Sequence, residues 1–419
     1  MRVFKVLLII IAAVAVSGAV VLAIAILQPK VESNQTQAAL DPFYTPPNPL
    51  VGKPGDIIRS EPLTGFNITN GAGYRILYLS QGPTGELRAS GGMVFVPTAA
   101  TAKDRPVVAF AHGTSGFGDA CAPSRDTATP VNQPFIQTIM DLGYVYTATD
   151  YVGLGTPGDP YYMIGESEAN DVVNSVRAAR NFPNSKAGTR YAVMGHSQGG
   201  HSALWTGSLG KKIAPDLDLV GVAVSAPAAQ LGPLLDQQWN TAIGWAIGPE
   251  VMLSWPTVYP NLNPNNLLTP KGAEKYTEIA FECIETAAMV GIAQESLLHN
   301  QLFSMSPKEN PAWNAIIEKQ TPPPLPPSMP VLMSQSMYDG IVLPNTNALT
   351  QERWCKAGSN LQTNWLGQLA TPPLEGDKTH GNTLLAAWPM MTDWIQSRFA
   401  NRPAASNCGF TSPIPPYSG

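Results

Sequence analysis

Charged residues are scarce in this chain. Asp, Glu, Lys and Arg together make up 13% of its 419 residues, and the net charge at pH 7 is -5. Proteins that bind nucleic acid carry a basic patch or stripe that meets the phosphates. The composition therefore argues against nucleic acid as a partner. Together with 40 prolines, it predicts a weakly charged surface rich in loops.

Cysteine and histidine are also few, with four and five residues. No Cys-x-x-Cys pair and no Cys/His cluster occurs, so we expect no metal site. The four cysteines, Cys121, Cys283, Cys355 and Cys408, are an even number, and two disulfides are expected in an exported chain. At this point three pairings are open.

The longest hydrophobic run lies near the N-terminus, from Val6 to Leu27, and follows Arg2 and Lys5. A run of this kind after basic residues is a secretory signal or a membrane span. We expect export, with the protein either secreted or held in the cell envelope by residues 6–27; cleavage and anchoring are both open. The polar, proline-bearing stretch from Gln28 to Pro49 is predicted to be a linker, and residues 1–40 form the first segment.

A Gly-x-Ser-x-Gly motif centred on Ser197 follows the apolar run Tyr191–Met194 and precedes a helix-like stretch. A strand that turns tightly into a helix needs minimal side chains beside the serine, which explains the glycines at 195 and 199. Such a turn exposes the serine hydroxyl. It also aims the backbone N–H of Gln198 at an oxyanion formed there. The motif predicts Ser197 as a nucleophile.

Strand-like and helix-like stretches alternate on both sides of this motif. Strands are expected at 74–79, 92–97, 106–111, 143–150, 219–224, 330–337 and 361–369, and helices at 170–180, with Asn170 as a candidate N-cap, and at 382–399. This alternation predicts a mostly parallel sheet flanked by helices. Together with the Gly-x-Ser-x-Gly turn, it predicts an α/β-hydrolase fold. Its two parts are residues 41–229 and 328–419. Between them, residues 230–327 contain apolar helical stretches and interrupt the alternation of strands and helices. This predicts an inserted helical cap.

A serine nucleophile needs a histidine base and an acid that orients it, and in α/β-hydrolases they follow in the order Ser, acid, His. Asp339 lies just past the predicted strand 330–337 and is the expected acid. His380, in a loop after the last strand, is the expected base. Asp377 is a rival acid, but it would share the loop of His380.

The remaining histidines fit the base role poorly. His112 and His196 precede Ser197, His201 lies on the helix that Ser197 begins, and His299 precedes Asp339 and belongs to the cap. His112 is expected to be structural.

The second oxyanion donor is expected in the small-residue loop after the buried strand 106–111. The backbone N–H of Thr114 is the candidate.

Several motifs taken together resemble the secretory lipase family that includes fungal lipase A. They are His112-Gly113-Thr114, Asp119-Ala120-Cys121-Ala122-Pro123-Ser124, Asp150-Tyr151-x-Gly153-Leu154-Gly155, Gly195-His196-Ser197-Gln198-Gly199-Gly200 and Asp339-Gly340. The resemblance implies a capped α/β-hydrolase that acts on carboxylic esters, including triacylglycerols, without a cofactor. It places the nucleophile, acid and base on Ser197, Asp339 and His380, and the oxyanion donors on Thr114 and Gln198. It also implies disulfides Cys121–Cys283 and Cys355–Cys408.

The expected partner is thus a lipid or other ester; association with a membrane or lipid interface is open. Two other functions are open. An acyltransferase would use the same acyl-enzyme and pass the acyl group to an alcohol, and a non-enzymatic envelope protein would only bind. The sequence predicts no oligomeric state.

Overall fold

The computed structural model describes residues 37–99, 103–125, 133–294, 299, 301–367 and 377–419. The chain divides into two compact units, Met1–Thr45 and Pro46–Gly419. In the first unit residues 37–44 form a helix, so this part of the predicted linker is helical instead. The apolar run at 6–27 lies outside the described residues. Within the described part of the chain, no helix has the length and apolarity needed to cross a membrane.

In the described part of the second unit, nine strands form one sheet in the order β1-β2-β3-β5-β4-β6-β7-β8-β9. The strands are β1 (Ile57–Pro62), β2 (Gly71–Gln81), β3 (Leu87–Pro97), β4 (Arg105–Ala111), β5 (Val145–Thr149), β6 (Ala187–His196), β7 (Asp218–Ser225), β8 (Val331–Ser336) and β9 (Leu361–Leu366). Pairing is antiparallel from β1 to β5 and parallel from β5 to β9. The predicted mostly parallel sheet is confirmed.

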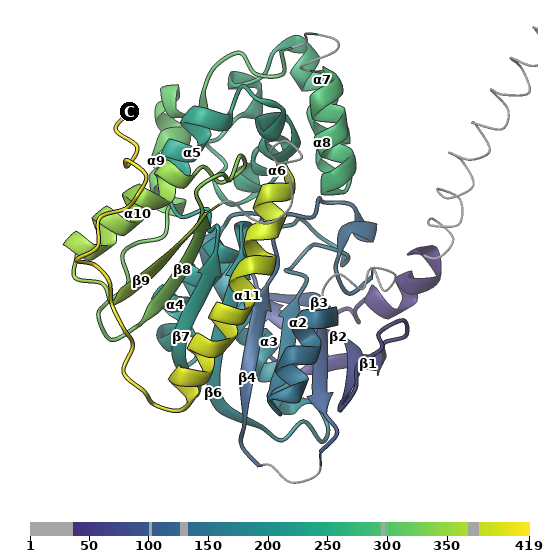
Figure 1. Ribbon diagram of the computed structural model, residues 1–419. Coiled ribbons are helices and arrows are strands. Elements are labelled where there is room, and N and C mark those ends of the chain that lie inside the picture. Colours follow the sequence, from purple (N-terminus) through teal and green to yellow (C-terminus); the bar gives the residue numbers. More distant parts are fainter. Residues whose placement is uncertain (1–36, 100–102, 126–132, 295–298, 300, 368–376) are drawn as a thin grey trace, which may run out of the picture. The chain divides into compact units, whose positions relative to one another are not determined.

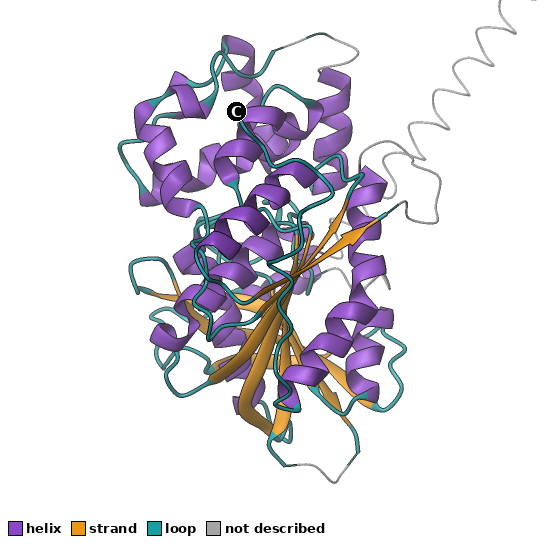
Figure 2. Cartoon of the chain, turned by 60° about the vertical axis from the view of Figure 1, so that its left-hand side comes forward, coloured by secondary structure: helices purple, strands orange, loops and turns teal. Residues whose placement is uncertain are grey.

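Helices cover both faces of this sheet (Figure 1, Figure 2). They are α2 (Gln133–Asp141), α3 (Gly165–Asn181), α4 (Gln198–Ile213), α10 (Pro344–Lys356) and α11 (Asp377–Phe399). One apolar core lies under α3, α4 and α10 and another under α2 and α11. The central strands are apolar on both faces because both faces are covered; in β4, for example, Val107 and Val108 are both fully buried.

Two predicted helix starts are wrong. Helix α3 begins at Gly165 rather than at Asn170, with Ile164 at the N-cap position, and the Asn170 side chain donates a hydrogen bond to the Gly82 carbonyl at 3.3 Å. Helix α11 begins at Asp377 rather than at Asn382. His380 therefore lies in the first turn of a helix and not in a loop.

Among the described residues between β7 and β8, where the sequence predicts an insertion, the structure has five α-helices. They are α5 (Leu231–Gln238), α6 (Ala242–Val258), α7 (Pro270–Ala280), α8 (Ile284–Ile292) and α9 (Pro311–Gln320). Polar caps start three of them, since the side chains of Thr241, Thr269 and Asn310 accept backbone N–H groups of α6, α7 and α9. These helices share an apolar core that also includes Phe117 and residues 162–164.

Two disulfides are present, Cys121–Cys283 and Cys355–Cys408, the pairing that the resemblance implies. The first joins the loop after β4 to the start of α8. Two backbone hydrogen bonds reinforce this connection, from Phe117 N–H to the Ala280 carbonyl at 2.8 Å and from Ile284 N–H to the Ser115 carbonyl at 3.0 Å. The loop that carries Thr114 is thus fastened to helices α7 and α8.

A buried carboxyl group in α3 makes stability depend on pH. Burial raises the pKa of Asp171 to about 7. Because the folded state holds this proton more tightly than the unfolded chain, the stabilisation is complete below about pH 4 and is lost as the pH rises through about 7.

We expect the free energy of unfolding of the wild type to fall relative to Asp171→Asn between pH 4 and 8, by at most about 4 kcal/mol. Asparagine does not ionise, so its profile lacks this component. Urea unfolding at several pH values, with disulfides intact, measures the difference. Parallel profiles for the two proteins would contradict the expectation.

Candidate active site

Ser197 lies in a strained turn between β6 and α4. Its backbone has φ 58° and ψ -122°, a conformation that costs free energy in a non-glycine residue and is often found at functional sites. The flanking glycines are required because a side chain at either position would overlap the backbone. A Cβ at Gly195 would lie 2.0 Å from the Gly199 carbonyl oxygen, and one at Gly199 would lie 1.9 Å from that of Ala111. This is the strand–turn–helix that the motif predicts.

His380 and Asp339 form a buried pair. Nδ1 of His380 lies 2.8 Å from Oδ2 of Asp339. The other carboxylate oxygen accepts the backbone N–H groups of Ile341 at 2.9 Å and Val342 at 3.1 Å. These donors fix Asp339 as an acceptor, so Nδ1 of His380 carries the proton. Nε2 is then the basic nitrogen, and among the described residues it is buried without a hydrogen-bond partner.

The imidazole of His196 lies beside that of His380, with ring centroids 4.4 Å apart. Residue 196 directly precedes Ser197, so the structure brings His380 close to the strained turn. Nδ1 of His196 donates to Ser225, whose hydroxyl oxygen is 2.9 Å away. Burial and the charge of His380 hold the pKa of His196 well below its ordinary value. This ring stays neutral at neutral pH.

The other histidines have different surroundings. His112 is buried, with its ring nitrogens 2.7 Å from the Gly113 carbonyl and 3.3 Å from that of Asp150, and burial lowers its pKa. His201 pairs with Glu168 inside the protein. His299 is exposed between α8 and α9. The side chain of the rival acid Asp377 lies outside the described residues.

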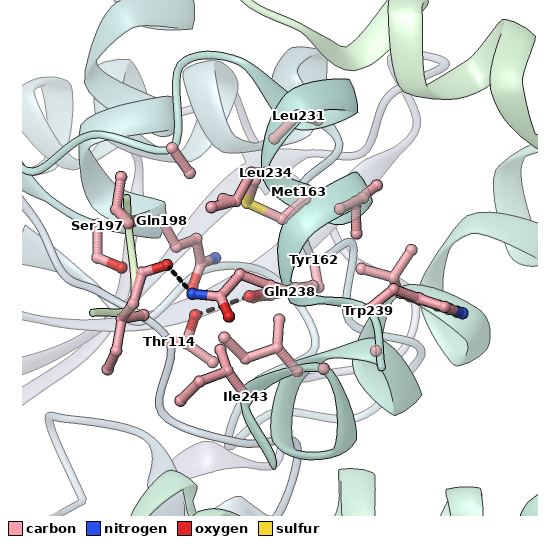
Figure 3. A pocket seen from close by; sticks show the side chains of 18 of the residues that line it. Thr114, Tyr162, Met163, Ser197, Gln198, Leu231, Leu234, Gln238, Trp239 and Ile243 are labelled. Carbon is pink, nitrogen blue, oxygen red and sulfur yellow. Dashed lines mark hydrogen bonds between the residues drawn. The ribbon is translucent and has the colours of Figure 1, made fainter. Parts of the chain in front are cut away.

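A pocket of about 70 Å³ opens at Ser197. Thr114 and Gln198 line it, as does Tyr162 (Figure 3). Its other walls come largely from α5 and α6 and, apart from Gln238, are apolar. The apolar lining residues include Met163, Leu231, Leu234, Leu235, Trp239, Ile243, Ile247, Val251 and Trp255. The site therefore consists of a polar end at Ser197 that continues into a largely apolar cavity in the helical insertion.

The two predicted oxyanion residues are held by their side chains. The Thr114 hydroxyl is 2.7 Å from the Tyr162 hydroxyl, and the Gln198 amide donates to Glu168 at 2.8 Å. Burial and the nearby Glu250 raise the pKa of Tyr162 well above its ordinary value, so the phenol is neutral. Tyr162 and Glu168 are missed by sequence reasoning, because no motif marks them.

The described ranges contain no candidate metal site. Among these residues no group of three His, Cys, Asp or Glu side chains is placed to hold a metal ion.

The mostly parallel sheet and the strand–turn–helix at Ser197 define an α/β-hydrolase. Solved structures share this fold, and two of them serve for comparison. The chain matches the esterase LipA of Xanthomonas oryzae with a TM-score of 0.69 and 17% identity over 84% of this chain and 100% of that one. It matches Candida antarctica lipase A with a TM-score of 0.69 and 19% identity over 90% of this chain and 89% of that one.

The family is identified by sequence. The model of the secretory lipase family matches residues 121–407, and the chain belongs to this family. A secreted triacylglycerol lipase of Malassezia globosa is 25% identical over 90% of this chain and 82% of its own length. Lipase A of Moesziomyces aphidis is 27% identical over 46% of this chain and 45% of its own. The predicted family and fold are confirmed, and the protein is a carboxylic ester hydrolase.

Proposed function

We propose that this protein is an exported lipase or esterase in which Ser197, His380 and Asp339 form a catalytic triad. The observation that carries the proposal is the buried His380–Asp339 pair, whose Nε2 is free to take a proton, beside a serine that opens into an apolar pocket. Export is supported by membership of the secretory lipase family. Lipid esters, triacylglycerols included, are the proposed substrates.

The reaction proceeds through an acyl-enzyme. Nε2 of His380 accepts the Ser197 proton as the oxygen attacks the ester carbonyl, and Asp339 stabilises the imidazolium that forms. The imidazolium then protonates the departing alcohol. Water, deprotonated by the same nitrogen, attacks the acyl-enzyme and releases the acid.

The oxyanion is held by the backbone N–H groups of Gln198 and Thr114. Gln198 is the first residue of α4, so its N–H has no partner within the helix and points with the helix dipole toward negative charge. Thr114 is fixed in place by its bond to Tyr162. Preorganised donors of this kind stabilise the transition state more than the ground state.

The acyl chain lies in the apolar pocket between Ser197 and helices α5 and α6. In this role residues 230–327 act as a cap that shields the reacting ester from water. Residues 41–229 and 328–419 supply the catalytic core.

Hydrolysis of p-nitrophenyl esters from acetate to palmitate, with and without an added primary alcohol, tests this function. We expect turnover with release mainly of free acid. A product that is mainly the new ester would favour the acyltransferase alternative. Absence of turnover at every chain length, in folded and oxidised protein, would contradict the proposal.

A further inference from the structure

A carboxylate–imidazole pair lies buried behind the proposed oxyanion site. Glu168 of α3 and His201 of α4 are 1% and 0% exposed, and Oε2 of Glu168 lies 2.7 Å from Nδ1 of His201. His201 directly follows the motif that surrounds Ser197, yet the proposed reaction gives it no role. Charged side chains are rarely buried unless a partner and hydrogen bonds compensate them.

The second oxygen of Glu168 holds two elements of the catalytic pocket. Oε1 accepts the side-chain amide of Gln198 at 2.8 Å and the backbone N–H of Met163 at 3.1 Å. Gln198 follows Ser197 directly, and Met163 follows Tyr162, whose hydroxyl bonds Thr114. One carboxylate oxygen therefore connects the two sides of the proposed oxyanion site.

The hydrogen bond from Met163 to Glu168 holds Met163 in an unfavourable backbone conformation. Met163 has φ 54°, a left-handed conformation that side chains other than glycine rarely adopt. Its N–H is fixed by the carboxylate, and its side chain lines the pocket beside Ser197. Without that acceptor the turn at 162–163 would lose its anchor.

His201 fixes Glu168 in turn. Nε2 of His201 lies 2.8 Å from the backbone carbonyl of Gln320, and a carbonyl oxygen only accepts. The indole nitrogen of Trp205 lies 3.1 Å from the same Nε2 and donates to that carbonyl at 3.2 Å. The ring is held at both ends, which leaves Glu168 one position.

The same cluster reaches the end of the helical insertion. Gln320 is the last residue of α9, and its side-chain oxygen accepts the backbone N–H of Gly165, the first residue of α3, at 2.7 Å. Thus the position of Glu168 is set jointly by α3, α4 and the segment through which the chain returns from the insertion to the sheet.

We propose that Glu168 is a positioning residue for the oxyanion site, with His201 and Gln320 as its support. It holds Gln198 at the start of α4 and, through Met163 and Tyr162, the loop of Thr114. The proposal rests on the proposed function, since it assigns a role to groups that act on the acyl-enzyme chemistry of Ser197.

The test compares two substitutions of Glu168. Glu168→Leu removes both acceptors, and we expect kcat to fall about 10²-fold, the scale on which small misplacements act, with little change in KM. Glu168→Gln keeps an oxygen for Gln198 and Met163 and donates its N–H to a neutral His201. It should restore kcat close to wild type.

The affinity for a boronic acid, which forms a tetrahedral adduct on the serine, separates positioning from mere support of the fold. In Glu168→Leu its inhibition constant should rise in parallel with the loss in kcat. Asp171→Asn is the matched control, since Asp171 is equally buried one turn further along α3 and is expected to change stability but not kcat. All rates are divided by the number of active sites that a phosphonate titrates.

Gln198→Met provides a second arm that does not depend on the folding of Glu168→Leu. It removes the side-chain amide and keeps the backbone N–H, so kcat and boronic acid affinity should fall. In the double variant that combines Glu168→Leu with Gln198→Met, the fold losses in kcat and in boronic acid affinity should be smaller than the products of the losses in the two single variants.

Wild-type kcat and boronic acid affinity in folded Glu168→Leu would overturn the proposal. If that variant does not fold, wild-type values in Gln198→Met would do so. Failure of the phosphonate to react with Ser197 in the wild type would instead refute the proposed function, so the two failures are distinguishable.

Discussion

Ser197→Ala is expected to lower kcat for ester hydrolysis by about 10⁶-fold, the loss seen when a triad serine is removed. The alanine leaves the pocket and the oxyanion donors in place but removes the atom that forms the acyl-enzyme. Initial rates with p-nitrophenyl butyrate measure the loss. Ser208→Ala, eleven residues further along in α4 and partly exposed, is the control and should retain the wild-type rate.

A rate for Ser197→Ala within about tenfold of wild type would refute the nucleophile, because triad chemistry without its serine is slower by orders of magnitude. Circular dichroism and an unchanged melting temperature establish that the variant is folded. Under those conditions the loss reports chemistry alone.

Asp339→Asn is expected to lower kcat by about 10⁴-fold. The backbone N–H groups of Ile341 and Val342 require an oxygen at the position of Oδ1, so the new amide group must face His380. Its N–H donates to Nδ1 and forces the imidazole proton onto Nε2. The histidine then presents a donor instead of a base to Ser197.

Asp393→Asn, an exposed carboxylate on α11, is the matched control and should keep full activity. A loss of less than about tenfold in Asp339→Asn would show that another group orients His380. In that case Asp377→Asn is the next variant to measure.

The sheet could be predicted because its signal is local. The strands around Ser197 are continuous apolar runs, which a covered parallel sheet requires, and the glycines at 195 and 199 mark the turn by the space they leave.

The starts of α3 and α11 could not be predicted in this way. No side chain caps α3, whose N-cap position holds Ile164. Its first turn is stabilised by a distant partner, the Gln320 side chain, which accepts the N–H of Gly165 from 155 positions away. A local sequence pattern does not indicate a contact between residues this far apart in the chain.

The polar residues of the site show the same contrast between local sequence signals and contacts that depend on the assembled fold. Ser197, Asp339 and His380 could be proposed because their order and flanking strands follow a known arrangement. Glu168 and Tyr162 could not, because Glu168 meets Gln198 and His201 at sequence separations of 30 and 33, and Tyr162 meets Thr114 at 48. Their contacts exist only once the sheet, α3 and α4 are assembled.

Covalent labelling by a p-nitrophenyl alkylphosphonate tests the central claim most directly. The reagent transfers its phosphonyl group to an activated serine and releases p-nitrophenol. We predict one phosphonyl group per chain, on the peptide that contains Ser197, loss of esterase activity in proportion to labelling, and no label in Ser197→Ala. A label on another residue, or esterase activity that persists in fully labelled protein, would contradict the account.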